Sequence, residues 1–359
     1  MKIGLVGLEK SGKTTVFNAL TKSNASTDAF SSKKAEPNMA MVDVADPRID
    51  KLQKLYCPKK ISYATIEFVD FVGIEKSQEK KELFSASELA LIKTMDALAL
   101  VLRNFDNELI TSAFGKPDPI TDLGTIFSEL VLSDLIIAET RLERIEHFRK
   151  RGVKNPQQEL EYKALTSVIE SLNANRPASI AQLSPQERKA IRGFQFLTMK
   201  PIMVILNSDE TNFGTNSKLL TNLGENFRVM EFAGRFEMEL CQLSEEEALA
   251  FMEDLNIEAS ARDRLTLLAY DLMGYLTFFT VGQDEVKAWT VRLGDTALEA
   301  AGAIHSDLAR GFIRAECFTC SDLLAVGSEK GLSEKGLLRL EGKDYIVKDG
   351  DILSIRFNV

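Results

Sequence analysis

The sequence predicts an α/β protein built on a parallel sheet, with a helical insertion and a smaller β-rich domain at the end of the chain. Strand-like apolar runs alternate with helical patterns over residues 1–125 and 199–275, which is typical of a parallel sheet covered on both faces. Residues 126–198 keep helical spacing throughout, and residues 276–359 contain mostly short strands. We therefore expect three domains with these boundaries.

The strands of the first part are short and rich in aliphatic or β-branched residues. A helix is expected over Thr14–Lys22, where Val16, Phe17 and Leu20 recur at helical spacing. A capping box of Ser85 and Glu88 predicts the start of a second helix, which runs to about Thr94. The expected strands are Ile3–Val6, Ile66–Phe71, Ala97–Leu102, Pro201–Leu206 and Phe227–Phe232.

The helical insertion resembles an antiparallel coiled-coil hairpin. Apolar residues recur with heptad spacing on two helices, and a basic turn, Arg149–Lys154, joins them. A further capping box, Ser184 and Glu187 with Pro185 at the first helical position, starts a third helix. The apolar positions are Leu135, Ala138, Leu142 and Ile145 on the first helix, and Tyr162, Leu165, Ile169 and Leu172 on the second.

The last 84 residues predict a β-grasp domain. Thr296 and Glu299 form a capping box for its one main helix, and Asp349-Gly350-Asp351 predicts a tight turn into the final strand. The strand-like runs are Val286–Leu293, Ile313–Phe318, Leu337–Leu340, Tyr345–Val347 and Ile352–Phe357.

Composition excludes several classes of protein. The chain has 359 residues, and 53 acidic against 44 basic residues give a net charge of −9, which argues against a surface that is a polycation throughout. No apolar run is long enough for a transmembrane helix, and the N-terminus lacks the pattern of a secretory signal. Four cysteines and two histidines are too scattered for a zinc or disulfide framework. We expect a cytoplasmic protein with reduced thiols.

The strongest motif is a phosphate-binding loop at residues 7–14, Gly-Leu-Glu-Lys-Ser-Gly-Lys-Thr. It follows an apolar strand directly and opens an amphipathic helix, which is the context that the G-x-x-x-x-G-K-[ST] pattern requires. Lys13 is expected to reach the β- and γ-phosphates and Thr14 to ligate Mg²⁺. The predicted nucleotide contacts in this segment are Gly7, Lys10, Ser11, Gly12, Lys13, Thr14 and Thr15.

Two later segments match the nucleotide-binding motifs of G proteins. Asp70 ends a strand, and Asp70-Phe71-Val72-Gly73 fits DxxG, so Asp70 is expected to support Mg²⁺ through water and Gly73 to sense the γ-phosphate. Asn207-Ser208-Asp209-Glu210 follows a strand where G proteins have NKxD. Glu210 is one methylene longer than the aspartate that pairs with guanine. We therefore expect guanine selectivity to be lost and adenine admitted, with Asn207, Ser208 and Glu210 at the base.

The chain resembles the Obg-like ATPase (YchF) family of translation-factor-class P-loop proteins over nearly its whole length. The residues that carry this resemblance include Glu36-Pro37-Asn38, Asp46-Pro47-Arg48, Ala288-Trp289-Thr290, Gly311–Glu316 and Arg356–Val359. The resemblance implies a G domain, a coiled-coil insertion and a C-terminal TGS domain. It also implies binding and hydrolysis of ATP, with GTP as the other candidate nucleotide, and association with ribosomes.

Departures from the family pattern lie in the segments that would switch with the nucleotide. Lys34 stands where the family has a Mg²⁺-binding threonine, and an ammonium group cannot ligate a cation. Ile74 stands where Ras-like proteins have the glutamine that orients water, and residues 75–81 replace a Gly-rich stretch. Two hypotheses remain open: a slow Mg²⁺-dependent NTPase, in which Lys13 is the catalytic residue, and a non-hydrolysing, nucleotide-gated scaffold.

The basic turn Arg149–Lys154 leaves two interpretations open as well. Residues 126–198 contain 11 basic and 9 acidic residues, so this is the one part of the chain with a net positive charge. Such a turn is either an ordinary solvated helix end or a contact for a polyanion. With the TGS domain, it is our candidate surface for ribosomal RNA or protein; neither a membrane nor the reading of a DNA sequence is expected.

Overall fold

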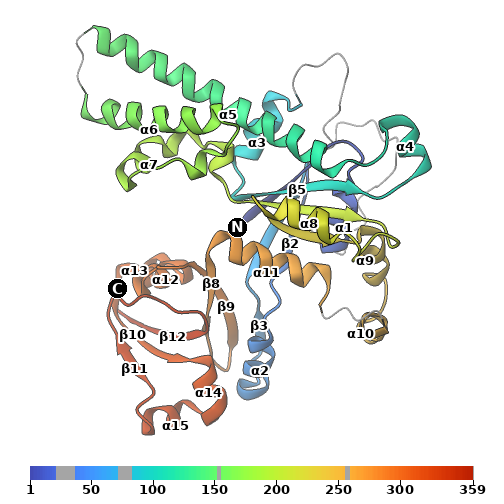
Figure 1. Ribbon diagram of the computed structural model, residues 1–359. Helices are drawn as coiled ribbons and strands as arrows, with labels where there is room; N and C mark the ends of the chain where they lie inside the picture. The colour runs from blue at the N-terminus through green and yellow to red at the C-terminus, as the bar shows by residue number, and fades with distance from the viewer. Residues whose placement is uncertain (22–36, 72–82, 152–154, 255–258, 359) are drawn as a thin grey trace. The chain divides into compact units, whose positions relative to one another are not determined.

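The computed structural model describes residues 1–21, 37–71, 83–151, 155–254 and 259–358. Backbone packing divides the chain into two compact units (Figure 1). The first contains residues 1–40 and 67–261, and the second contains residues 41–66 and 262–359. Residues 41–66 and 262–275 were expected in the first α/β domain, whereas the structure groups them with the C-terminal part of the chain.

The first unit is built on a six-stranded sheet in the order β2-β4-β1-β5-β6-β7. Strand β1 pairs in parallel with β4 and β5, and β6 pairs in parallel with β5 and β7, as the alternating pattern predicted. The strands are β1 (Lys2–Val6), β2 (Asn38–Asp43), β4 (Thr65–Asp70), β5 (Ala97–Asn104), β6 (Ile202–Ser208) and β7 (Arg228–Phe232).

Two helices of the first unit begin at predicted capping boxes. The capping boxes at Ser85 and Ser184 are both formed, each with reciprocal hydrogen bonds to a glutamate three residues on. The helices of this unit are α1 (Lys13–Thr21), α3 (Ala86–Lys93), α4 (Glu108–Phe114), α5 (Pro119–Lys150), α6 (Pro156–Asn173), α7 (Pro185–Ile191), α8 (Ser217–Gly224), α9 (Gly234–Leu240) and α10 (Glu245–Asp254), with 3-10 turns η1 (Ala178–Ile180), η2 (Arg192–Phe194) and η3 (Leu197–Met199).

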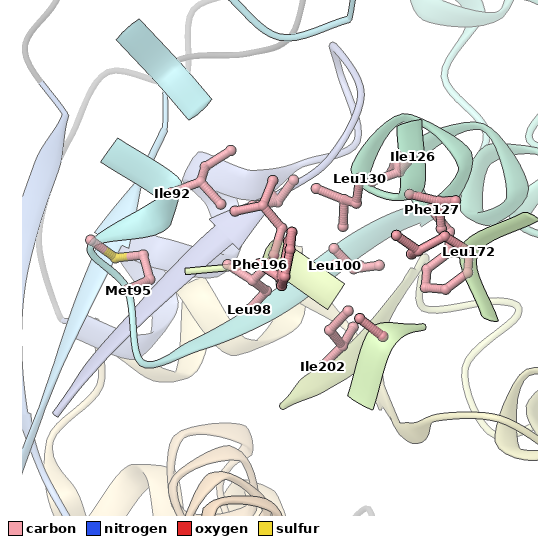
Figure 2. Packing of buried hydrophobic residues seen from close by; sticks show 14 of the residues in the cluster. Ile92, Met95, Leu98, Leu100, Ile126, Phe127, Leu130, Leu172, Phe196 and Ile202 are labelled. Atoms are coloured by element: carbon pink, nitrogen blue, oxygen red, sulfur yellow. The ribbon is translucent and has the colours of Figure 1, made fainter. Parts of the chain in front are cut away.

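Helices α5 and α6 form the predicted hairpin (Figure 1). Helix α5 begins before residue 126, the expected start of the insertion, because Asp118 caps it and Pro119 occupies its first turn. The hairpin shares one hydrophobic core with the sheet: Ile126, Phe127 and Leu172 from the helices belong to the same buried cluster as Leu100 of β5 and Ile202 of β6 (Figure 2). The insertion is therefore anchored to the sheet by continuous apolar packing.

Asp134 of α5 adds a polar anchor inside this core. Its fully buried carboxylate accepts hydrogen bonds from the backbone N–H groups of Leu197 and Thr198, at 2.7 and 2.8 Å, and from the Thr198 hydroxyl at 2.7 Å. Burial raises the pKa of this carboxyl, while the same three hydrogen bonds oppose the rise. The contacts fix η3, the turn that leads the chain into β6.

The second unit contains a mixed sheet in the order β11-β10-β12-β8-β9-β3. Strand β12 pairs in parallel with β8, and the neighbouring pairs β8–β9 and β10–β12 are antiparallel. Helix α12 (Ala297–Ile304), started by the predicted capping box, packs its alanines into the core with Phe278 and Val291. The strands are β3 (Lys60–Ser62), β8 (Tyr275–Thr280), β9 (Glu285–Arg292), β10 (Phe312–Thr319), β11 (Arg339–Glu341) and β12 (Asp351–Phe357).

This sheet with its helix is the arrangement expected for a β-grasp domain. The other helices of the unit are α2 (Pro47–Tyr56), α11 (Ala261–Met273), α13 (Ser306–Arg310), α14 (Cys320–Val326) and α15 (Glu329–Glu334). The predicted strand at Tyr345–Val347 is wrong, since this segment makes only an isolated bridge between Ile346 and Thr296. The strand Tyr275–Thr280 was not predicted as an element of its own.

Residues 41–66 join the second unit through strand pairing and through charged side chains, among them Arg48. Strand β3 pairs in parallel with the edge strand β9. Arg48 of α2 bonds to Asp46 and, at 2.6 Å, to Asp349, and its guanidinium lies 5.0 Å from the centre of the Phe279 ring. These contacts explain why the structure groups this segment with the C-terminal residues.

The cysteines match the prediction of reduced thiols in the part of the chain that the structure describes. All four are free, and Cys317 and Cys320 are both buried. Cys317 lies in β10, and Cys320 opens helix α14. No helix among the described residues is long and apolar enough to cross a membrane.

Candidate functional site

The loop between β1 and α1 has the tight curl of a phosphate-binding loop. Lys10 and Gly12 have positive φ angles, 60° and 88°, and the Ser11 N–H bonds back to the Leu8 carbonyl at 3.2 Å. At Gly7, a Cβ atom would lie 2.5 Å from the carbonyl oxygen of Val101, so only glycine allows the loop to pass this close to β5. The loop leads directly into the N-terminus of α1, whose first N–H groups favour an anion.

Lys13 is buried beside this loop. Its ammonium donates hydrogen bonds to the carbonyl oxygens of Gly7 and Leu8, at 2.7 and 2.9 Å. Burial lowers the pKa of Lys13 to about 8, and the negative charges of Asp70 and Glu9 act against this shift. The Lys13 ammonium has exchanged water for two neutral carbonyl oxygens. A charged phosphate would therefore be a stronger hydrogen-bond partner than either carbonyl.

Thr14 and Asp70 meet at the ends of α1 and β4. The Thr14 hydroxyl donates to Asp70 Oδ2 at 2.8 Å, and the Asn38 amide lies 3.4 Å from the same oxygen. Asp70 is 2 % exposed, and burial raises the pKa of its carboxyl, while the bond from Thr14 and the charge of Lys13 oppose the rise. Its other oxygen, Oδ1, has no hydrogen-bond partner among the described residues.

These oxygens suit a small hard cation. Mg²⁺ in phosphate-binding sites takes one or two protein oxygens and fills its shell with water and phosphate, and an unpartnered buried carboxylate oxygen is an acceptor for such a water. The described residues contain no group of three or more His, Cys, Asp or Glu side chains that would hold a metal without a ligand. The Thr14 hydroxyl and Asp70 Oδ1 are oxygens of the kind that such a cation or its water takes.

Asn207 braces the loop from the end of β6. Its amide nitrogen donates to the Ser11 carbonyl at 3.1 Å, and its amide oxygen accepts from the Gly234 N–H at 3.2 Å. Both contacts depend on glycines, because a Cβ atom at Gly12 would overlap Asn207 Nδ2, and a Cβ atom at Gly234 would lie 2.7 Å from Asn207 Oδ1. One side chain thus joins the loop, β6 and the first residue of α9.

Ser208 points into a different environment. Its hydroxyl donates to the buried carboxylate of Glu231 on β7 at 2.7 Å and accepts from the Asn104 amide at 2.9 Å. Glu231 was not among the predicted site residues, although an acidic residue in the apolar run Val229–Phe232 was a usable signal. Glu210 is exposed in the turn after β6.

Most of the predicted site residues lie together in one unit. Lys10 lies 3.9 Å from Glu9 in an ion pair, and Thr15 lies beside Gly234. Gly73, Lys34, Ile74 and residues 75–81 fall outside the described residues. The side chains or backbone that meet around the loop are those of Gly7, Ser11, Gly12, Lys13, Thr14, Asp70 and Asn207.

Comparisons with known proteins match both ends of the chain to family models. Residues 2–128 match the model described as a 50S ribosome-binding GTPase, and residues 275–358 match YchF-GTPase_C, described as a protein of unknown function. The first match covers strands β1 to β5, and the second covers strands β8 to β12.

Full-length relatives are similar over almost the entire chain. A protein of Bacillus subtilis called ribosome-binding ATPase YchF is 38% identical, with 99% of each chain covered. The protein of the same name from Haemophilus influenzae is 39% identical, with 100% of this chain and 99% of the relative covered. The solved structure of the Schizosaccharomyces pombe YchF GTPase matches with a TM-score of 0.87 at 29% identity, covering 99% of this chain and 97% of that one.

The close approach at Gly12 gives a direct test of the loop geometry. Gly12→Ala places a methyl group against the Asn207 amide at a positive φ, so we expect it to lower the melting temperature and the free energy of unfolding by about 1–3 kcal/mol. Thermal and denaturant unfolding measure this.

Gly124→Ala is the matched control. Gly124 lies inside α5, and a Cβ atom added there would have no neighbour within 4 Å. Because alanine favours a helix, this variant should be as stable as the wild type or more so. A Gly12→Ala protein as stable as the Gly124→Ala protein would contradict the described loop geometry.

Proposed function

The chain belongs to the YchF family, and on that premise we propose that it is a magnesium-dependent P-loop NTPase that binds ATP, hydrolyses it slowly and associates with ribosomes. The observation that carries the nucleotide-binding part is the buried Lys13 ammonium beside the Thr14–Asp70 pair. The names of the relatives support the ATPase and ribosome-binding parts. A ribosome-associated protein would act in the cytoplasm.

The triphosphate would bind in the curl of the loop. The N–H groups of the loop and of the first turn of α1 would surround the β-phosphate, and Lys13 would exchange its two carbonyl partners for β- and γ-phosphate oxygens. The Thr14 hydroxyl would leave Asp70 and ligate the cation. Asp70 would accept a hydrogen bond from a water bound to the cation. Mg²⁺ supplies charge neutralisation of the phosphates when bound.

We propose ATP rather than GTP as the preferred nucleotide. Guanine selectivity in G proteins requires an aspartate for the N1 and N2 hydrogens and a lysine against the base, and this chain has Glu210 and Ser208 there. The Ser208 hydroxyl is engaged with Glu231 and Asn104, so it offers no cation or apolar surface to the base. Asn207 was expected at the base, whereas its amide bonds to the Ser11 carbonyl and to the Gly234 N–H.

A second candidate function is a nucleotide-gated scaffold that does not hydrolyse. The substitutions Lys34 and Ile74 favour it, because neither side chain ligates Mg²⁺ or orients water. Both candidates require the same binding site and differ only in turnover.

Single-turnover hydrolysis separates the two candidates. With purified protein in excess over radiolabelled ATP, in the presence and absence of ribosomes, we expect slow release of phosphate that Lys13→Ala reduces at least about a hundredfold, because the γ-phosphate loses its cation. Hydrolysis that continues unchanged in a Lys13→Ala protein that no longer binds ATP would identify a contaminant. ATP binding without any phosphate release would favour the scaffold.

The lowered pKa of Lys13 predicts how binding depends on pH. Phosphate pairs with the protonated amine, and the free protein loses that proton as the pH rises through about 8, so ATP affinity should fall about tenfold between about pH 7 and pH 9. Calorimetric titrations across this range measure it. Lys13→Arg should bind more weakly but without this slope, since arginine stays charged. A wild-type affinity that is flat over the range would contradict the assignment.

The tip of the α5–α6 hairpin offers a test of the ribosome contact. Arg149, Lys150 and Arg151 are all exposed, but Arg149 also stacks on Tyr162 at 4.1 Å and lies 3.3 Å from Glu159, so it supports the hairpin. Reversing Lys150 and Arg151 to glutamate should weaken co-sedimentation with ribosomes, most clearly at low salt. Residues 152–154 of the predicted basic turn fall outside the described part of the chain.

The matched control reverses Arg188 and Lys189 to glutamate. Both are exposed on α7, so the change in net charge is identical but lies away from the tip. Equal weakening by the two double variants would mean that net charge, and not the hairpin tip, governs the association.

A further inference from the structure

Glu231 is a buried acidic residue on which three hydrogen-bond donors converge. Its side chain is 9 % exposed on β7. One carboxylate oxygen accepts from the Ser208 hydroxyl at 2.7 Å and from the Asn216 amide at 2.6 Å, and the other accepts from the Gly214 N–H at 3.1 Å. A buried carboxylate is stable only when donors satisfy it, so these three groups are held together by one charge.

All three donors belong to the connection from β6 to α8. Asn216 occupies the N-cap position of α8, yet its side chain makes no cap hydrogen bond, because its amide is directed to Glu231 and to the Asn212 carbonyl at 2.6 Å. Within the connection, Asp209 accepts from the Asp106 N–H at 3.2 Å and from the Asn212 N–H at 2.9 Å. The segment 208–216, which carries Glu210, is therefore fixed at both ends.

Glu231 lies on the opposite face of the sheet from Asn207, the residue that braces the phosphate-binding loop. In β6, successive side chains point to opposite faces, so Asn207 faces the loop and Ser208 faces away from it. The register pairs Leu206 with Glu231, which puts the carboxylate on the Ser208 face. One face of β6 therefore carries Asn207, which holds the phosphate-binding loop. The other face carries Ser208, through which Glu231 holds segment 208–216.

We propose that Glu231 is a positioning residue for recognition of the base: it fixes segment 208–216 and so contributes to the affinity for the base but not for the triphosphate. This inference rests on the proposed nucleotide-binding function and deepens it. The ligand class is a purine nucleoside triphosphate, whose base would lie against the residues that follow Asn207.

Glu231→Gln tests the inference with little change in volume. The amide has only one acceptor oxygen, and its NH₂ group would face a donor among Ser208, Asn216 and Gly214, so the connection loses part of its support. We expect ATP affinity to fall about tenfold, the order of one lost hydrogen bond to a charged group, while affinity for inorganic tripolyphosphate stays unchanged. Both affinities are measured by displacement of a fluorescent ATP analogue, with Mg²⁺ present.

Two further variants keep the test decisive. Ser208→Ala removes one of the donors and should lower the ratio of ATP affinity to tripolyphosphate affinity, by a smaller factor than Glu231→Gln does. This variant replaces Glu231→Gln in the test if Glu231→Gln does not fold. Glu225→Gln is the control, because Glu225 is exposed after α8 and its replacement removes the same charge. The affinity ratio of this control should equal that of the wild type.

The outcomes are distinct. A ratio that falls in Glu231→Gln and Ser208→Ala, with the folded state verified by thermal unfolding, supports the inference. Equal loss of ATP and tripolyphosphate affinity, or no loss of either, overturns it while leaving nucleotide binding intact. A folded wild-type protein that binds neither tripolyphosphate nor ATP overturns the proposed function itself.

Discussion

The nucleotide site depends on how closely the Asn207 amide approaches the backbone of the phosphate-binding loop. The amide nitrogen occupies the space where a side chain at residue 12 would begin, and the amide oxygen does the same at Gly234. Two glycines thus allow one asparagine to hold the loop, the end of β6 and the start of α9 in one arrangement. The loop in turn sets where Lys13 and Thr14 stand, so the chemistry of the site follows from this packing.

The site contains polar groups that would be costly elsewhere in a protein interior. Lys13 is buried with a lowered pKa, Asp70 is buried with a raised one, and Asp70 Oδ1 and the Ser11 hydroxyl find no partner among the described residues. Unsatisfied groups of this kind are tolerated where a ligand supplies the missing partners. A triphosphate with a bound cation would satisfy the ammonium and the carboxylate together, so the residues that lower the stability of the protein here favour ligand binding.

Local patterns predicted the loop and much of the fold, because the information lies in adjacent residues. The spacing of Gly7, Gly12 and Lys13 determines the curl, and the capping boxes at Ser85, Ser184 and Thr296 place their helices. Long-range pairing was not predictable in the same way. Strand β3 has only three residues and pairs with β9, more than two hundred residues away, so no local signal assigns it to the C-terminal sheet. Glu231 carried a local signal, as an acidic residue in an apolar run, but its role was missed because its partners come from β6 and the segment after it.

The Thr14–Asp70 pair is the part of the site that a nucleotide would complete as a cation site. Calorimetric titration of the folded protein with ATP, with and without Mg²⁺, tests this directly when Asp70→Asn is titrated alongside. We predict that Mg²⁺ strengthens ATP binding to the wild type and that Asp70→Asn loses this gain while keeping the affinity seen without Mg²⁺. A folded protein that binds no ATP, or an Mg²⁺ effect that survives Asp70→Asn unchanged, would contradict the proposed cation site.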